Sequence, residues 1–325
     1  MIRKRFLGLF AAILLAMVAT ISAAQDERAR EKARIGYAAN TLAFLGMFVA
    51  NDTGLYAKQG LEVELIQLRP SIGIAALISG DVDYLENLGS AIRAASRGAP
   101  IRLVSTNIRA PFFSLAVHPK FKSVKELKGR TIGVNSIGGT NYISARAVLQ
   151  HHNVDPDREA KILAIGDQTL VYEALKIGRV DAVMATPPFS VLLKREGFPL
   201  LAHAADVLSI PFVGLSTTLS KINRNRSQAK RVLKAEVEAL RLIHTNPRGT
   251  QEVIRRRFAM DEQMATDSYH VVVSSFSQDG RIPHQGIGAL LETEKKDGAV
   301  PQSVTVEQVT DSTLIDEAIR ELGGK

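Results

Sequence analysis

Short apolar runs alternate with amphipathic segments along most of the chain. Runs rich in Val, Ile and Leu predict strands, and apolar residues three or four positions apart predict helices. In the first third, strands are expected at 34–38, 61–68, 82–85 and 101–106, and helices at 71–79 and 90–97. Further strands are expected at 131–134, 161–165 and 180–184, and helices at 140–152, 168–177 and 189–196. Strands that alternate with helices predict an α/β protein with mainly parallel sheets.

Two stretches of this pattern resemble each other. The motif Ala76-Leu77-x-x-Gly80-x-Val82-Asp83 recurs 98 residues later as Ala174-Leu175-x-x-Gly178-x-Val180-Asp181. Likewise, Ile35-Gly36 recurs 97 residues later as Ile132-Gly133. A strand–helix–strand unit repeated in two lobes explains both matches, and chance similarity between two α/β segments is the alternative.

The last hundred residues predict helices without strands. Residues 227–245 form an amphipathic helix, and Pro247, Asp261, Pro283 and Asp311 each mark the start of another. Because such a segment has no sheet of its own, it should pack on one of the lobes. We expect lobe 1 to comprise 34–117 plus 214–325 and lobe 2 to comprise 118–213. Two chain crossings, near 117–120 and 206–213, would form a hinge that lets the lobes open and close.

The first 24 residues have the pattern of an export signal. A basic segment, Arg3 to Arg5, precedes an apolar run, Phe6–Ile21, and Ser22-Ala23-Ala24 supplies small residues before a cleavage site at Gln25. An uncleaved membrane anchor is the alternative. Without a Cys at the cleavage point, lipid attachment there is excluded. These observations predict a periplasmic protein.

The composition excludes several kinds of functional site. The chain has no Cys, which excludes disulfides, thiolate-bound zinc, iron–sulfur clusters and a cysteine nucleophile. Its net charge of +8 falls to +5 without the three basic residues of the signal, so a nucleic-acid partner is not expected. The basic run 255–257 lies in an expected helix and reads as a solvated face. No His-based or Ser-based catalytic motif is present, and we expect no catalytic residue, metal or cofactor.

Candidate ligand-binding residues lie in the loops after the expected strands. In parallel α/β sheets ligands bind beyond the carboxyl ends of the strands, so two facing lobes would share one cleft. The candidates in lobe 1 are Asn40, Thr41, Phe44, Arg69, Ser71, Asn87, Leu88 and Arg109. The candidates in lobe 2 are Asn135, Gly138, Gly139, Thr140, Asn141, Thr186 and Pro187.

The loop 135–141 is the most specific of these segments. It follows a strand and opens a helix, so its glycines permit close backbone approach and its free N–H groups favour an anion by about 0.3–1 kcal/mol. Thr140 either caps the helix or donates its hydroxyl to a ligand, and a plain glycine turn is the alternative. Arg69 and Arg109 could supply a charge partner, or could be ordinary surface arginines. The set predicts a small organic ligand with an apolar body and an acidic group.

Several segments also resemble a known family. The matching motifs are Gly54-Leu55-Tyr56-Ala57-Lys58-Gln59-Gly60-Leu61-Glu62-Val63, Leu127-Lys128-Gly129-Arg130-Thr131-Ile132-Gly133-Val134, Gly138-Gly139-Thr140, Gly178-Arg179-Val180-Asp181-Ala182 and Pro187-Pro188-Phe189. From about residue 34 to its end, the chain resembles the exported solute-binding proteins of ABC importers in the taurine/alkanesulfonate/nitrate group, which also includes proteins similar to the thiamine-pyrimidine synthase.

The resemblance implies a type II periplasmic binding fold, with a ligand enclosed between two lobes joined by two hinge strands. It also implies delivery to a membrane permease with its ATPase, by a protein expected to be a monomer. The loops at Thr41, Ser71, Asn87, Thr140 and Thr186 correspond to ligand-contacting loops of the family.

Two other functions stay open. A sensor subunit that presents a bound ligand to a signalling receptor would use the same closed form. An enzyme like the pyrimidine synthase is the other alternative, although a chain without Cys cannot reproduce the cysteine-rich iron-binding motif of that group.

Overall fold

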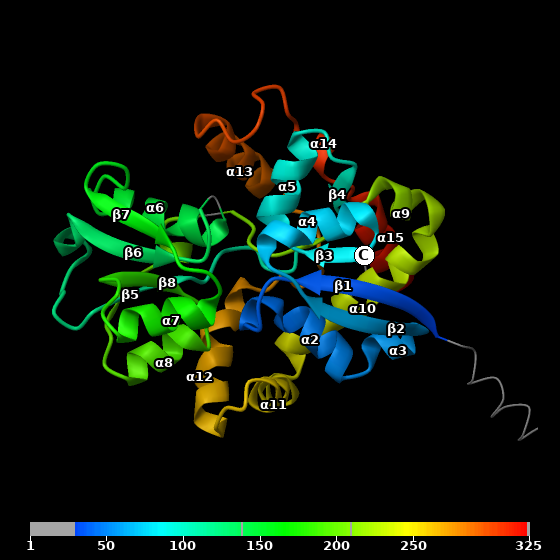
Figure 1. Cartoon of the computed structure of the whole chain (residues 1–325). Helices are drawn as coiled ribbons and strands as arrows, with labels where there is room; N and C mark the ends of the chain where they lie inside the picture. Colours follow the sequence, from blue (N-terminus) through cyan, green and yellow to red (C-terminus); the bar gives the residue numbers. More distant parts are fainter. Residues whose placement is uncertain (1–29, 138, 209, 324–325) are drawn as a thin grey trace, which may run out of the picture.

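The computed structural model describes residues 30–137, 139–208 and 210–323, so the expected export signal lies outside the described residues. It contains two lobes, each built on a five-stranded sheet with helices on both faces (Figure 1). The strand orders are β2-β1-β3-β10-β4 in lobe 1 and β7-β6-β8-β5-β9 in lobe 2, and in each sheet the fourth strand, β10 or β5, is antiparallel to the strands beside it. The predicted architecture of two α/β lobes is confirmed.

Lobe 1 begins the chain and also receives its end. Its strands are β1 (Glu31–Tyr37), β2 (Leu61–Gln67), β3 (Tyr84–Glu86), β4 (Ile101–Leu103) and β10 (Leu215–Thr218). Between them lie η1 (Leu42–Phe44), α2 (Leu45–Asp52), α3 (Leu55–Lys58), α4 (Pro70–Ser79) and α5 (Leu88–Ser96). After β10 follow α9 (Leu219–Arg224), α10 (Arg226–Thr245), α11 (Pro247–Arg257), α12 (Glu262–Val272), η4 (Val273–Ser275), α13 (His284–Lys296), α14 (Val306–Val309) and α15 (Thr313–Glu321).

Lobe 2 is one continuous stretch of chain. Its strands are β5 (Ser114–Val117), β6 (Arg130–Val134), β7 (Ala160–Ala164), β8 (Ala182–Ala185) and β9 (Leu200–His203). Its helices are η2 (Val124–Leu127), α6 (Thr140–His151), α7 (Gln168–Lys176), α8 (Phe189–Arg195) and η3 (Ala204–Asp206). Within the part of the chain that the structure describes, no helix combines the length and the apolar character that crossing a membrane requires.

The boundary between the lobes differs from the expected one. The strand expected at 101–106 ends at Leu103, and residues 104–113 already cross to lobe 2, whereas the crossing was expected at 117–120. Residues 114–117 form β5, which pairs with β8 and β9 of the second sheet. The sequence pattern missed β5, β9 and β10, because each is a four-residue strand outside the strand–helix–strand units.

The repeated motif occupies equivalent places in the two sheets. Ile35-Gly36 lies in β1 between β2 and β3, and Ile132-Gly133 lies in β6 between β7 and β8. Asp83 and Asp181 accept a hydrogen bond from a backbone N–H of β1 and of β6, at 2.8 and 3.1 Å respectively. Each also pairs with a lysine that closely follows the antiparallel strand, Lys221 at 2.8 Å and Lys120 at 3.2 Å. The two lobes therefore share the strand topology as well as the hydrogen bond and the ion pair of this aspartate.

The glycine of each motif fills a site where a side chain has little room. A Cβ on Gly133 would lie 3.2–3.4 Å from side-chain carbons of Val183, Ile165 and Val180. Valine side chains have stiff rotamers and cannot easily move away. We therefore expect Gly133→Val to destabilise lobe 2 by about 1–3 kcal/mol in urea unfolding. The control is Ala164→Val at an exposed position of the neighbouring strand; equal stabilities of the two variants would contradict the packing argument.

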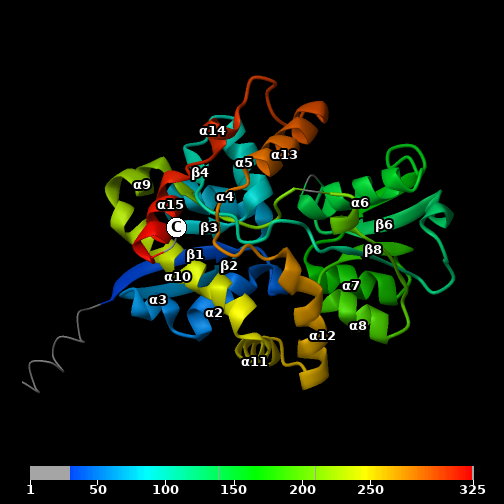
Figure 2. The same ribbon diagram turned by 180° about the vertical axis from the view of Figure 1, so that it is seen from behind.

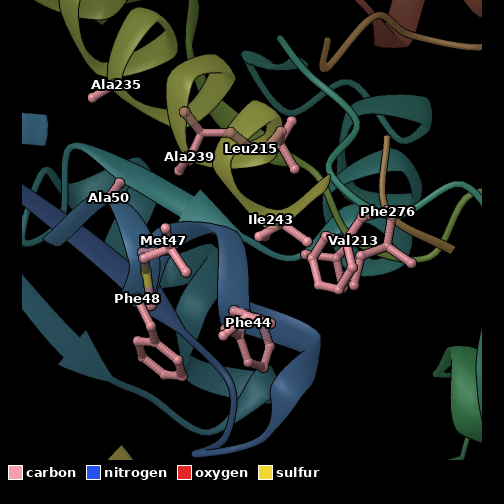
Figure 3. Close-up of a cluster of buried hydrophobic side chains, with 14 of the residues drawn as sticks. Phe44, Met47, Phe48, Ala50, Val213, Leu215, Ala235, Ala239, Ile243 and Phe276 are labelled. Carbon is pink, nitrogen blue, oxygen red and sulfur yellow. The ribbon is translucent and has the colours of Figure 1, made fainter. Parts of the chain in front are cut away.

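The main core of lobe 1 joins the first helix after β1 to the long helix α10. Met47 of α2 lies toward Ala239 of α10, and small residues such as Ala235 and Ala239 let the two helices approach closely (Figure 3). The rings of Phe44 and Phe48 point away from α10 and contact Tyr37. Residues 227–245, expected to form an amphipathic helix, pack here through the apolar face of α10. In Figures 1 and 2, α10 and α11 thus lie on the lower side of lobe 1, and α12 lies below the junction of the lobes, beside α8.

The two expected chain crossings lie side by side where the lobes join, and a third segment of lobe 1, residues 276–277, lies against them. The backbone N–H groups of Asn107 and Ile108 both donate to the Val213 carbonyl, at 2.8 and 3.0 Å. On the other side, the N–H of Ser277 donates to the Asn107 carbonyl at 2.9 Å. Ile108 forms a β-bridge to each neighbouring segment. The segment after α12 therefore packs against the hinge without crossing between the lobes.

Candidate functional site

The carboxyl ends of the parallel strands in both sheets lie at the junction between the lobes. In Figure 1 the arrowhead of β1 points toward lobe 2. Two contacts bring the following loops together: the N–H of Leu42 donates to the Pro187 carbonyl at 3.3 Å, and a Cβ built on Gly89 would lie 3.4 Å from Thr140 Oγ1. Ile143 of α6 also packs into the apolar cluster of lobe 1. The two sheet edges are therefore in contact in this structure.

On the side of lobe 2, three amide side chains hold the loops in place. Asn141 accepts from the N–H of Asn135 at 3.0 Å and donates to the Met184 carbonyl at 2.8 Å. Gln168 donates to Asn135 Oδ1 at 2.6 Å and accepts from the N–H of Thr186 at 3.2 Å. These bonds tie the starts of α6 and α7 to the ends of β6 and β8. The amides of Asn135 and Asn141 thus position the loops through bonds within the lobe.

The loop before α6 presents a free helix start. Gly139 occupies the N-cap position without a side-chain cap, and Thr140 is the first helical residue, so its hydroxyl does not cap the helix. The twelve-residue helix therefore directs its first N–H groups toward the junction, where they favour negative charge. Gly138 lies outside the described residues.

After β8, the chain places the Thr186 hydroxyl and the Pro187 carbonyl at the junction. Thr186 is 1% exposed, and its Oγ1 has no hydrogen-bond partner among the described residues. Leaving a buried hydroxyl unpaired costs about 1–3 kcal/mol, so this group is available to a ligand. The Pro187 carbonyl takes part in the contact with Leu42 described above.

The candidates of lobe 1 divide into loop and core residues. Thr41, 3% exposed, precedes η1 without capping it, and Asn40 beside it is exposed. Asn87 caps α5 by accepting from the N–H of Ser90 at 3.3 Å, and Leu88 is buried in that helix. Phe44, expected to line the site, lies in the core, where its ring centre is 5.7 Å from that of Tyr37 (Figure 3).

The two candidate arginines lie apart from these contacts. Arg69 is exposed at the start of α4, and Ser71 follows in the first turn of that helix. Arg109 does not follow a strand end as expected, because β4 stops at Leu103 and Arg109 belongs to the hinge. It lines a cavity of about 310 Å³ at the hinge. Asp279 also lines this cavity, but none of the other candidate ligand-binding residues does.

Sequence reasoning missed a buried acid pair directly beneath this site. Glu86 ends β3, beside Asn87, and faces Glu236 of α10; both side chains are about 1% exposed. Asn107 Nδ2 donates to both, at 2.7 Å to Glu86 Oε1 and 3.2 Å to Glu236 Oε2. Tyr56 also donates to Glu236, at 3.2 Å. The pair therefore links β3, the hinge and the long helix.

Burial raises the pKa of both carboxyl groups. Desolvation is the largest cause, and it brings the pKa of Glu236 to about 7. The pKa of Glu86 rises well above its usual range, first through desolvation and then through the negative charge of Glu236. Glu86 Oε2 has no hydrogen-bond partner among the described residues. The raised pKa values favour retention of a proton by this acid pair beside the hinge.

Solved structures show the same fold. The alkanesulfonate-binding protein SsuA from Xanthomonas axonopodis pv. citri, bound to MOPS, has a TM-score of 0.75 at 17% identity, covering 87% of this chain and 98% of its own. The nitrate-binding protein NrtA from Synechocystis PCC 6803 has a TM-score of 0.77 at 15% identity, covering 90% and 89%. Among sequence relatives, the protein described as putative binding protein YtlA of Bacillus subtilis (strain 168) is 18% identical over 93% of this chain and 94% of its own.

An enzyme shares the fold as well. The desulfurization enzyme DSZB has a TM-score of 0.65 at 14% identity, covering 89% of this chain and 99% of its own. Identities this low establish the fold alone. It is the two-lobed fold of type II periplasmic binding proteins.

A family model extends the evidence beyond the fold. Residues 41–250 match the model described as NMT1/THI5 like, which covers both sheet edges and the hinge crossings. The match spans well over half of the chain. The chain therefore belongs to the NMT1/THI5-like family.

Proposed function

We propose that this protein is the solute-binding component of an ABC-type importer and that it captures a small organic anion by closure of its two lobes. One observation carries the proposal: loops from both sheet edges meet across the hinge at Leu42–Pro187 and at Gly89–Thr140. A solute held there would contact both lobes. The sulfonate-binding and nitrate-binding proteins with this fold support an anionic solute.

The groups at the junction suit an anion. The N–H groups at the start of α6, the Thr140 hydroxyl and the buried Thr186 hydroxyl are donors that have no other assigned role. A micromolar affinity requires about 8 kcal/mol, and turning a mostly open population into a mostly closed one requires a preference of about 5.5 kcal/mol for the closed form. A helix terminus supplies at most about 2 kcal/mol, so apolar burial and the hydroxyl donors must supply the rest.

Exposed apolar side chains support docking to a permease. Ile72 at the start of α4, Ile137 before α6 and Leu170 at the start of α7 are 50%, 58% and 51% exposed. All three lie at the carboxyl edges of the sheets, and both lobes contribute. A permease that contacts this rim would recognise the closed arrangement of the lobes. We propose that the protein acts in the periplasm as a monomer, with such a permease and its ATPase as partners.

We also propose that the site binds without catalysing a reaction. The loop candidates, from Asn40 to Pro187, contain no nucleophile hydrogen-bonded to a histidine or carboxylate base among the described residues. The amides that line the second sheet edge are held by one another. Such a site can enclose a solute and release it unchanged.

The proposal predicts stabilisation by one class of solutes. A thermal-shift screen of the protein with sulfonates, carboxylates, aromatic acids, nitrate and neutral pyrimidines should single out an organic anion. Ligand at a hundred times its Kd stabilises the folded state by about 2.7 kcal/mol. Stabilisation by pyrimidines alone would contradict the anionic solute, and turnover of the stabilising compound would contradict the binding role.

A further inference from the structure

A second cavity lies beside β5 and β9 of the second sheet, next to the segment that follows β8. Its volume is about 450 Å³, and it is bounded by α8, by β5 and β9, and by α12 of the C-terminal helices. Because α12 packs on lobe 1 and the other elements belong to lobe 2, both lobes form its wall. None of the candidate residues of the loop junction lines it.

A hydrogen-bonded serine and histidine form its polar side. Ser114 begins β5, pairs with His203 at the end of β9, and is 1% exposed. Ser114 Oγ lies 2.9 Å from His203 Nδ1. When the hydroxyl donates to Nδ1, or when the ring is protonated, Nε2 carries a hydrogen and becomes a donor. In Ser-His-Asp catalysis the serine bonds to Nε2 and a carboxylate to Nδ1, so this pair has the opposite arrangement and favours binding over nucleophilic attack.

The remaining walls combine one cation with apolar surface. Lys194 of α8 lines the cavity, and within the described residues no carboxylate pairs with it. Phe198 and Leu200 form apolar walls on lobe 2, and Val271 of α12, 42% exposed, faces them from lobe 1. A cation, an imidazole donor and apolar walls together are the recognition elements for an organic anion.

The cavity lies beside ion pairs that join the lobes. Arg195, next to Lys194, pairs with Asp261 at 3.3 Å and with Asp267 at 3.1 Å. Asp261 is the N-cap residue of α12, and Asp267 lies in the middle of that helix. A molecule in the cavity would therefore contact the same two elements that these pairs connect, and it would favour the lobe arrangement in which they meet.

From these observations we infer that the cavity between α8, β9 and α12 is a second binding site for a small organic anion with an apolar body. Lys194 and His203 Nε2 hold the anionic group, Ser114 orients the imidazole, and Val271 and Phe198 contact the apolar body. Occupancy of this site favours the lobe arrangement held by Arg195. The inference does not depend on the solute that binds at the loop junction.

The test uses benzoate as the probe, with benzamide as its neutral counterpart, on the full-length mature chain. Titration with benzoate followed by NMR should shift the signals of the His203 imidazole and the Val271 methyl groups, and benzamide should bind at least tenfold more weakly. The variant Lys194→Gln should weaken benzoate binding at least tenfold. Ser114→Ala should weaken it as well, because the imidazole loses its orienting partner.

The matched control is Lys161→Gln, which removes the same charge from an exposed position of β7, the opposite edge strand of the same sheet. This variant should bind benzoate like the parent. Equal affinities of the Lys194 and Lys161 variants, or equal binding of benzoate and benzamide, would overturn the inference. Benzoate shifts confined to Thr140 and Thr186 would place the anion at the loop junction; that result would overturn the second site and support the proposed function.

Discussion

The variant Glu86→Gln is expected to be more stable than the parent at neutral pH. Folding of the parent favours proton uptake at Glu86, since the unfolded chain ionises this group in its usual range and burial raises its pKa in the folded protein. Glutamine needs no proton: its Oε1 can accept from Asn107, and its Nε2 can donate to Glu236. The gain grows with pH, by at most about 1.4 kcal/mol for each pH unit above the usual Glu range, for as long as the folded parent keeps the proton.

The direction of the pH dependence follows from the same shift. A carboxyl group whose pKa is raised by folding contributes its stability at low pH and loses it as the pH rises above the unfolded value. Both Glu86 and Glu236 act in this direction, and the contribution of Glu236 is lost as the pH rises to its folded pKa of about 7. The parent should therefore lose stability between about pH 4.5 and pH 7, and the variant should show a clearly flatter curve.

Urea unfolding at several pH values between 4.5 and 8 measures both effects. The matched control is Glu64→Gln, an exposed carboxylate on β2 of the same lobe, which should unfold like the parent. A second variant, Asn107→Leu, removes the donor that serves both acids and should destabilise the protein at every pH. An unchanged pH slope in the Glu86 variant would show that Glu86 is ionised in the folded protein.

The variant Thr140→Trp is expected to prevent closure. The Thr140 hydroxyl is already at contact distance from the position a Cβ would occupy on Gly89, so an indole ring has no room between α6 and α5. The lobes should be held apart, and the solute identified by thermal shift should bind at least a hundredfold more weakly, or about 2.7 kcal/mol. The same loss would confirm that this loop belongs to the site.

Distances between spin labels can measure the lobe arrangement directly. The chain has no Cys, so labels introduced by Glu62→Cys on β2 and Lys161→Cys on β7 would be the only ones. These positions lie on the outer strands of the two sheets. Thr140→Trp should lengthen the distance between them, and the control Thr169→Trp, at an exposed position of α7, should leave it unchanged. Equal distances in both variants would remove Thr140 from the closing surface.

The fold could be predicted from the sequence where local pattern and internal similarity agreed. The motif around Gly36 recurs around Gly133, and the two occupy equivalent strands with equivalent neighbours. The antiparallel strands were missed because they are short and because each pairs with residues distant in sequence. The position of the hinge was predicted wrongly for the same reason. The apolar sequence of β5 would suit a strand of either sheet, and only its pairing with β8 and β9 assigns it to lobe 2.

The candidate site shows a similar division. Sequence reasoning found the loops at Thr41, Asn87, Thr140 and Thr186, because strand ends and helix starts are local features. It could not assign roles within them. The amides of Asn135 and Asn141 bond to one another and to Gln168, and Phe44 enters the core. The acid pair joins residues 150 positions apart, Glu86 and Glu236, each of which resembles an ordinary surface glutamate in sequence.

The position of β10 has a consequence for synthesis of the chain. All five strands of the second sheet lie between residues 114 and 203, so that lobe can assemble as soon as this stretch has left the ribosome. In the first sheet, β4 is joined to β3 only through β10, which is made later. The first sheet therefore cannot be completed until lobe 2 has been translated. Until residue 218 emerges, β3 of the nascent chain has an unpaired edge where β10 will bind.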